Sequence, residues 1–323
     1  MTDAQSPSPI KAADNTEDVV IGGRHTPLDY LFFTRPVLMP PVWTIALLGA
    51  ASVSPRSITW YDWAVLIVQL WCLFGAVYTL NQICDVESDR INRKLFFLPD
   101  SLIPMSRART FTIALNIVAV SLACLFGYEY VIFTIVIVLL GIVYSVGRWP
   151  WKNNPILGYL TNVIAHGSIV YMMGAVFAGG TLSASWLGSL PYAIAVGGVY
   201  LATTVADIPG DRASGKRTIG VWIGARATMI VAALSIAGAL VLASALDELP
   251  MIVAAAVVLP VYGWATGGNL SRRAPKAARW AVASLSLVTV LYFPTYAILL
   301  ILGFIGARTF FLWRFGMTYP RFR

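Results

Sequence analysis

Charged residues are scarce in this chain of 323 residues, where Asp, Glu, Lys and Arg together make up 12%. An ordinary soluble domain carries about 25% charged residues. Because 58% of the residues are hydrophobic, the composition excludes a soluble globular domain, and it also excludes a disordered chain, which needs low hydrophobicity. We therefore expect an all-α, polytopic membrane protein.

Cysteine and acidic residues are also few. The three cysteines form no CxxC pair, which excludes a disulfide framework. The 15 acidic residues face 23 Lys and Arg, for a net charge of +8. In a soluble protein this excess would suggest a nucleic-acid partner, but basic cytoplasmic loops of a membrane protein explain it equally well. We therefore predict a lipid bilayer and no nucleic acid as partner.

Long apolar runs are what the sequence has instead. Nine segments approach the ~20 residues that cross a bilayer core, and no strand pattern competes with them: 36–53, 62–84, 108–127, 129–147, 155–178, 185–206, 226–246, 250–267 and 279–304. The polar residues 1–28 are expected to form a disordered cytoplasmic tail and not a cleaved signal peptide. The membrane domain is then 29–305, followed by a basic and aromatic tail, 306–323.

The basic residues predict an orientation. They gather in the loops after the even-numbered segments, whereas the alternate loops contain only Arg56. By the positive-inside rule, the N-terminus and the even-numbered loops are cytoplasmic. Arg308 and Arg314 in the C-terminal tail fall on the opposite side in this count. Either the tail lies in the interface, or the last segment is miscounted.

An acidic motif follows the second segment. Asn81, Asp85 and Asp89 are spaced i, i+4 and i+8, which places them on one face of a helix. A charged side chain near a bilayer costs about 2.5–3.5 kcal/mol at its centre. The fold alone gives no reason to accept this cost, so a cation is expected to compensate the carboxylates.

A second acidic motif ends the sixth segment. Asp207 and Asp211 are again four apart, but Pro209 and Gly210 lie between them. We expect a regular helix to stop near Ile208, with one carboxylate on the helix end and the other in the following turn. Both motifs lie on the predicted cytoplasmic side, so they can face each other.

Carboxylate and amide oxygens suit Mg²⁺, which prefers one or two carboxylates together with substrate phosphates. Two or three Mg²⁺ ions and a diphosphate would balance the four aspartates. Basic side chains beside the motifs can bind the outer phosphate oxygens, although the topology rule also explains their presence: Arg93, Lys94, Lys152, Arg212, Lys216 and Arg217.

A polar stripe interrupts the fifth segment, where Asn162 and His166 are spaced i, i+4. His166 is the only histidine in the predicted spans. It can remove a proton or bind the polar end of a substrate; alternatively, the pair forms a hydrogen bond between helices.

These residues resemble the UbiA superfamily of intramembrane prenyltransferases. That superfamily has nine transmembrane helices and two motifs, NxxxDxxxD and DxxxD, and the resemblance covers about residues 30–305. Tyr144 and Lys152 look like the family's tyrosine and lysine after the fourth helix. The run from Gly210 to Thr218 looks like its loop after the sixth helix.

The resemblance implies a function. Asn81, Asp85, Asp89, Asp207 and Asp211 would hold Mg²⁺ against the diphosphate of an allylic isoprenyl donor. Loss of diphosphate would leave an allylic carbocation in a dry helix bundle at the cytoplasmic side, and a lipophilic acceptor would attack it. This makes the chain a transferase of alkyl groups.

The acceptor is less constrained. The loop after Asp89 departs from the RP(I/L)xxG run of quinone, haem and archaeal-lipid members. It looks more like the branch of lycopene elongases, which favours an isoprenoid alkene such as lycopene and places an aromatic acceptor second. Attack within the donor itself would make the protein a membrane terpene cyclase.

Two other classes of membrane protein are alternatives to a prenyltransferase. An ion-coupled transporter also uses intramembrane acids, but we find no inverted repeat with matching broken helices, and the acids gather at one side. The CDP-alcohol phosphotransferases need a DG after the first aspartate pair and a downstream GxxxDxxxD, and neither is present.

Overall fold

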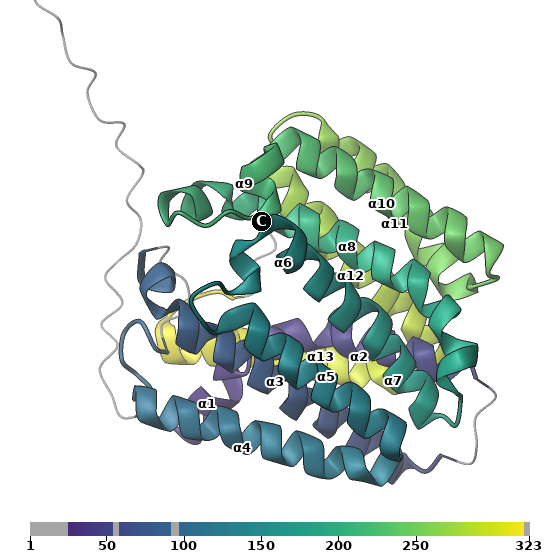
Figure 1. The fold of residues 1–323 in the computed structure, drawn as a ribbon, viewed down its shortest axis with the longest axis horizontal. Helices are drawn as coiled ribbons and strands as arrows, with labels where there is room; N and C mark the ends of the chain where they lie inside the picture. Colours follow the sequence, from purple (N-terminus) through teal and green to yellow (C-terminus); the bar gives the residue numbers. More distant parts are fainter. Residues whose placement is uncertain (1–24, 54–57, 92–96, 320–323) are drawn as a thin grey trace, which may run out of the picture.

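The computed structural model describes residues 25–53, 58–91 and 97–319, and these contain helices but no strand (Figure 1). The helices are α1 (Pro27–Phe33), η1 (Pro36–Leu38), α2 (Met39–Ala51), α3 (Trp60–Ile91), α4 (Met105–Ala123), η2 (Cys124–Phe126), α5 (Tyr128–Ser145), η3 (Trp151–Asn153), α6 (Pro155–Asn162), η4 (Val163–Ile169), α7 (Val170–Phe177), α8 (Leu182–Ala213), α9 (Ile219–Ile223), α10 (Ala225–Ala245), α11 (Leu249–Thr266), α12 (Leu270–Tyr292) and α13 (Tyr296–Phe315).

The long helices lie side by side in one bundle (Figure 1). On one side α3 packs against α4 and α5; on the other, α8, α10, α11 and α12 pack against one another. The continuous helix α6–η4–α7 and the short α2 lie between these groups, because α7 contacts α2 and η4 contacts α8. The all-helical prediction is confirmed.

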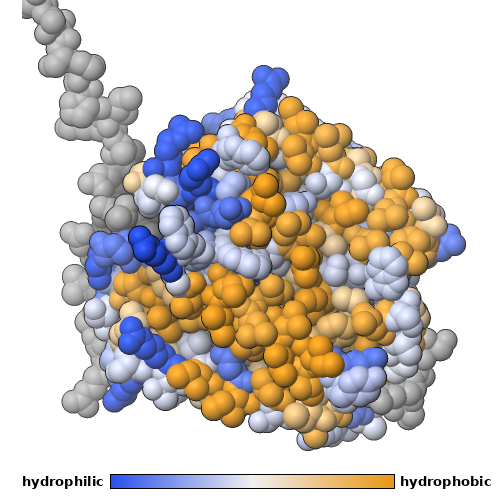
Figure 2. Space-filling model, viewed as in Figure 1, coloured by the Kyte–Doolittle hydropathy of each residue, from blue (hydrophilic) through white to orange (hydrophobic). Residues whose placement is uncertain are grey.

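The outer surface is that of a membrane protein. Hydrophobic side chains cover the middle of the visible face, and hydrophilic ones lie mostly at its rim (Figure 2). Large apolar side chains stay exposed, among them Leu291 at 78% and Val241 at 70%. A soluble monomer rarely exposes so large an apolar area, so this surface is suited to lipid.

Nine helices among the described residues are long and apolar enough to cross a membrane, which agrees with the predicted number. They are not the same nine segments, however. The expected span 279–304 is wrong, because the chain breaks after Tyr292 and divides into α12 and α13. α12 carries basic residues in its first half and is not among the nine, yet it packs inside the bundle against α8, α11 and α2.

Pro294 explains the break between α12 and α13. A proline lacks the N–H that continues a helix and disfavours the helical conformation of the residue before it. Phe293 accordingly has φ −132° and ψ 78°. Asn269 caps the other end of α12 by accepting a hydrogen bond from the Arg272 N–H, so the helix starts well before the predicted span.

α13 returns the chain to the end of the bundle that holds α1. Arg314, in its last turn, lies 3.0 Å from the buried carboxylate of Asp29 on α1. The predicted C-terminal tail therefore begins inside a helix, and Arg314 lies at the same end of the bundle as α1. The miscounted last span explains why Arg314 fell on the opposite side in the prediction. α1 itself starts at Pro27, capped by Thr26, inside the stretch expected to be disordered; residues 1–24 lie outside the described residues.

Two glycines let α2 and α7 approach closely. A Cβ atom at Gly49 would overlap the carbonyl of Tyr171 on α7, and one at Gly174 would overlap the carbonyl of Ala46 on α2. Within lipid, helices have no hydrophobic driving force to associate. Small residues at such crossings instead allow close van der Waals packing. This contact fixes α2 against the helix that carries the polar stripe.

Candidate active site

α3 and α8, each of 32 residues, present the acidic motifs near their C-terminal ends. α8 does not stop near Ile208 as the sequence suggested; it continues through Pro209 to Ala213. A proline in a helix removes one hydrogen bond to the preceding turn, but packing can carry the helix past it, as happens also at Pro191. Asp207 and Asp211 therefore share one helix face, like Asp85 and Asp89.

Asp85 is the centre of a three-residue ion cluster. Its Oδ2 lies 2.9 Å from Lys152 Nζ, and its Oδ1 lies 3.1 Å from Lys216 Nζ. Lys152 stands on η3, between α5 and α6, and Lys216 stands in the loop after α8. All three side chains are largely buried. The cluster therefore joins the first motif to the segment that follows the second.

Carboxylates of both motifs lie near two tyrosines, Tyr144 and Tyr200. Asp85 and Asp211 both lie close enough to Tyr144 to act on it electrostatically, and Asp207 and Asp211 act in the same way on Tyr200. The Tyr144 hydroxyl interacts with the side chains of Asn162 and Tyr200. The second motif is also held from its own loop, since the Thr218 hydroxyl donates a 2.9 Å hydrogen bond to Asp211. Asp85, Asp207 and Asp211 thus lie around this pair of tyrosines, and Asp89 lies near Arg35. We call this region the acidic mouth.

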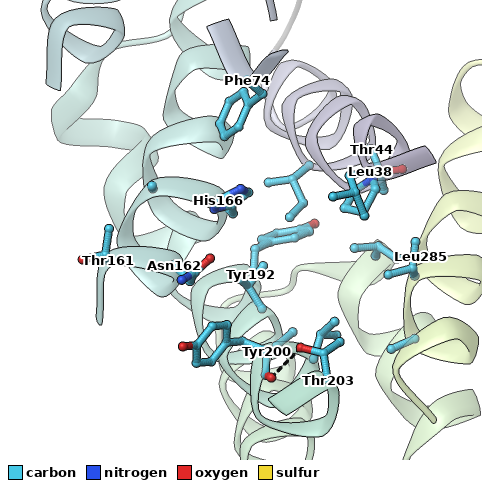
Figure 3. A pocket seen from close by; sticks show the side chains of 18 of the residues that line it. Leu38, Thr44, Phe74, Thr161, Asn162, His166, Tyr192, Tyr200, Thr203 and Leu285 are labelled. Carbon is cyan, nitrogen blue, oxygen red and sulfur yellow. Dashed lines mark hydrogen bonds between the residues drawn. The ribbon is translucent and has the colours of Figure 1, made fainter. Parts of the chain in front are cut away.

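Tyr144, Tyr200 and Arg35 also line a cavity of about 370 Å³, so the acidic mouth borders this cavity. Asn81, Tyr144, Asn162 and His166 line it. Most of the remaining wall is apolar and comes from α2, α3, α5, α8, α11 and α12. Figure 3 shows labelled side chains from several helices converging on this space. The site combines an acidic, ionic entrance with an apolar interior.

His166 lies in the wall on η4, a seven-residue π-helical segment between α6 and α7. π-helical turns often occur at functional sites. Its Nε2 is 3.3 Å from the Tyr78 hydroxyl, and its ring centroid lies 4.9 Å from that of Phe74. Next to it, Gly167 allows η4 to contact the backbone of Ala193 on α8. The imidazole therefore sits at the cavity wall among aromatic rings.

Arg35 is a site residue that the sequence reasoning missed. It stands between α1 and η1 in the left-handed conformation, φ 58° and ψ 61°, which costs a residue with a Cβ about 1–2 kcal/mol. Its side chain lines the cavity and lies near Asp89 and Asp85. The available signal was an arginine directly before Pro36 at the entrance to the first span.

The remaining predicted phosphate-binding residues divide into two groups. Arg212 and Arg217 are exposed, and no described contact brings either into the site. Arg93 and Lys94 lie outside the described residues. Of the six basic candidates, Lys152 and Lys216 are thus the two that the structure places against an acidic motif.

The donor set fits Mg²⁺ shared with a phosphate group. Among the described residues, no three carboxylate, histidine or cysteine side chains are close enough to hold an ion by themselves. Mg²⁺ does not need such a cage, since it keeps waters and takes one or two carboxylates together with substrate phosphates. Because Lys152 and Lys216 both pair with Asp85, this carboxylate already accommodates positive charge. The fitting residues are Asn81, Asp85, Asp89, Asp207 and Asp211.

Comparison with known sequences identifies one family. The family model described as the UbiA prenyltransferase family matches residues 42–288. The chain is 30% identical over 186 residues to a digeranylgeranylglyceryl phosphate synthase of Methanococcoides burtonii, covering 57% of this chain and 64% of that protein. It is 28% identical over 174 residues to a chloroplastic 2-acylphloroglucinol 4-prenyltransferase of Humulus lupulus, covering 50% and 42%. The chain thus spans less than two thirds of the length of these curated relatives.

Solved structures share the fold. A UbiA homologue from Archaeoglobus fulgidus bound to GPP and Mg²⁺ superposes with a TM-score of 0.69 at 15% identity, covering 84% of this chain and 99% of that one. An apo UbiA homologue from Aeropyrum pernix K1 gives 0.63 at 18% identity, covering 83% and 98%. The family match ends at residue 288, before α13 begins.

Proposed function

The chain belongs to the UbiA prenyltransferase family, and on this premise we propose that it transfers an isoprenyl group from an allylic diphosphate to a lipophilic acceptor with the help of Mg²⁺. The observation that carries the proposal is the mouth of the cavity. There Lys216, from the loop after the second motif, pairs with Asp85 of the first motif beside an apolar chamber. A diphosphate with an isoprenoid tail has the matching division between a charged head and an apolar chain.

The acidic motifs would hold the head group. Asn81, Asp85, Asp89, Asp207 and Asp211 are the proposed Mg²⁺ ligands, and the bound ions would supply Lewis-acid stabilisation of the negative charge on the leaving diphosphate. Lys152 and Lys216 already lie at this position. Each can turn from Asp85 to a phosphate oxygen and form a charge-assisted hydrogen bond.

The reaction takes place at one allylic carbon atom of the donor. The bond between the allylic carbon and the diphosphate oxygen breaks, and the electron pair leaves with the diphosphate. The allylic cation that remains needs a dry site, which the apolar cavity provides. The aromatic rings of Phe74 and Tyr78 line this cavity, and their faces can stabilise a cation.

The acceptor then supplies the electron pair for the new bond and must release a proton. His166 provides an imidazole base on the cavity wall, and its Nε2 lies 3.3 Å from the Tyr78 hydroxyl. We assign the proton to His166, with Asn162 and Tyr144 placing the acceptor beside the donor's reactive carbon. The largely apolar lining favours a neutral, lipophilic acceptor.

Two acceptor classes have separate support. The apolar lining favours an isoprenoid alkene such as lycopene, with an aromatic acceptor next. The names of several relatives favour a lipid alcohol that becomes an isoprenyl ether, as in digeranylgeranylglyceryl phosphate. If the donor supplies its own nucleophile, the protein is a membrane terpene cyclase.

The basic residues support an active site that faces the cytoplasm. The first half of α12 carries Arg272, Arg273 and Lys276, and Arg314 lies at the same end as α1. Positive charge gathers on the cytoplasmic side of membrane proteins. We therefore place α1, both acidic motifs and the end of α13 on that side.

The test is release of diphosphate from geranylgeranyl diphosphate by purified protein in detergent, with Mg²⁺ and with chelator. Metal-dependent release supports the proposed chemistry, and no release under any condition supports a transporter. Product analysis then separates the acceptors. A cyclic hydrocarbon formed without acceptor indicates a cyclase, whereas a product containing added lycopene, an added aromatic compound or a lipid alcohol identifies the transferase and its substrate.

A further inference from the structure

Three hydrogen-bonded residues form a wall at the cavity end away from the acidic motifs. The Tyr192 hydroxyl donates to Glu248 Oε2 at 3.1 Å, and the Tyr171 hydroxyl donates to Oε1 of the same carboxylate at 2.8 Å. The two rings lie 4.7 Å apart between centroids. We name these residues the tyrosine wall. Tyr192 and Tyr171 are almost completely buried, so the wall is fixed in position by both packing and hydrogen bonds.

A second cavity lies behind the wall. Its volume is about 210 Å³, and Tyr171, Glu248, Ser52 and Ser185 are among the residues that line it. Tyr192 lines the larger cavity, whereas its partners Tyr171 and Glu248 line the smaller one. The wall therefore separates two spaces. Gly188 leaves room for the carboxylate, since a Cβ there would come within 2.7 Å of Glu248 Oε1.

Tyr192 stands on the same face of α8 as the rest of the cavity lining. Ala195, Val196 and Val199 follow it at i+3, i+4 and i+7, and all three line the cavity. Asp207 follows Tyr192 by 15 residues of α8, which is about 22 Å at 1.5 Å per residue. One helix thus carries a carboxylate at the mouth and the blocking ring at the far end. In Figure 3 the Tyr192 ring points inward, toward Leu38 and Thr44.

We propose that the tyrosine wall sets the longest isoprenoid tail that the site accepts, with Tyr192 as the residue that determines specificity. This inference rests on the proposed function, because it takes the occupant to be the tail of an allylic diphosphate held at the acidic mouth. Until its end reaches the wall, a tail buries more apolar area with each added isoprene unit. A longer one meets a ring that Glu248 holds in place and that cannot rotate away without losing its hydrogen bond.

The experiment uses the full chain in detergent micelles with geranyl, farnesyl, geranylgeranyl and solanesyl diphosphates. Two readouts are taken for each: Mg²⁺-dependent diphosphate release, as kcat/KM, and thermal stabilisation of the protein, which reports binding without turnover. The wild type is expected to lose both responses beyond a certain tail length. Tyr192→Leu removes the ring and is expected to raise the ratio of long to short donors by on the order of tenfold.

Two further variants keep the test decisive. Tyr192→Phe preserves the ring and is expected to retain the wild-type preference. Val199→Phe introduces a ring about 10 Å nearer the mouth and is expected to shift the preference to shorter donors, even if Tyr192→Leu does not fold. Leu302→Ala, on the exposed surface of α13, is the control and should change nothing.

The outcomes separate the two proposals. Equal responses of the wild type to all four donors, or an unchanged preference in both Tyr192→Leu and Val199→Phe, would overturn the role of the wall. Absence of diphosphate release by the wild type would count against the proposed function alone, because the binding readout still ranks the four tail lengths.

Discussion

Lys216, in the loop after α8, places its Nζ 3.1 Å from Asp85 Oδ1 on α3. The two residues are 131 positions apart in the sequence and belong to the two acidic regions. Lys152 meets the other oxygen of the same carboxylate at 2.9 Å. The contact brings the first acidic motif against the loop that follows the second.

Asp85→Asn and Asp207→Asn should each lower kcat/KM for diphosphate release by on the order of a hundredfold or more. Each substitution removes a carboxylate that would bind the Mg²⁺ ions, and these ions would stabilise the leaving diphosphate. Asparagine keeps the size of the side chain, so insertion and thermal stability should stay close to wild type. The matched control is Asp62→Asn, at the exposed start of α3. Full activity in either active-site variant would refute a mechanism that uses both motifs.

Mg²⁺ and inorganic diphosphate together should raise the thermal midpoint of the wild type. A ligand at about 100 times its Kd stabilises the folded state by about 2.7 kcal/mol. Excess chelator should abolish both this stabilisation and diphosphate release. Asp85→Asn should show a much smaller shift at the same concentrations, because the variant lacks one of the proposed Mg²⁺ ligands. An equal shift in the variant would place the ligand elsewhere.

His166→Gln should slow formation of the prenylated product by about 10²–10⁴-fold, the usual contribution of a positioned general base. Binding of the donor should remain, since His166 contacts Tyr78 and Phe74 and not the acidic motifs. The stabilisation by donor and Mg²⁺ is therefore the internal control. If His166 merely packs helices together, stability will fall while the turnover of the folded fraction stays unchanged.

Both motifs were predictable because they are local. The i, i+4 spacing places Asp85 with Asp89, and Asn162 with His166, whatever the rest of the chain does. The structure brings these residues to one mouth and one cavity. Pro294 was also readable as a helix break, and overlooking it produced one long final span where the chain has α12 and a returning α13.

Other features depend on contacts between distant segments and leave no local pattern. Arg35 adopts the left-handed conformation against its intrinsic preference, and α8 continues through Pro209 against the local signal. Glu248 belongs to neither acidic motif, and its tyrosine partners lie 56 and 77 positions away.

Glu248 should make stability depend on pH. Burial raises the pKa of its carboxyl above the usual value, partly offset by the hydrogen bonds from Tyr171 and Tyr192. A raised folded-state pKa means that the native protein binds a proton more tightly than the unfolded chain. This stability is fully present below the unfolded pKa, about 4.3, and is lost as pH rises through the folded value. Thermal midpoints from pH 4 to 8 should decline less steeply in Glu248→Gln, and identical slopes would contradict the prediction.

The ion pair between Arg314 and Asp29 should anchor α13 to α1. Asp29 is fully buried and Arg314 nearly so, and removing one partner of a buried pair costs about 3–5 kcal/mol because the other charge is left uncompensated. Arg314→Met should therefore lower the thermal midpoint strongly, whereas the exposed Arg308→Met, on the same helix, should lower it little. The double variant Arg314→Met with Asp29→Asn should recover much of the loss, because no buried charge remains. If the double variant is as unstable as the two single losses added together, the residues do not act as a pair, and α13 is held instead by the aromatic cluster around Phe310 and Phe32.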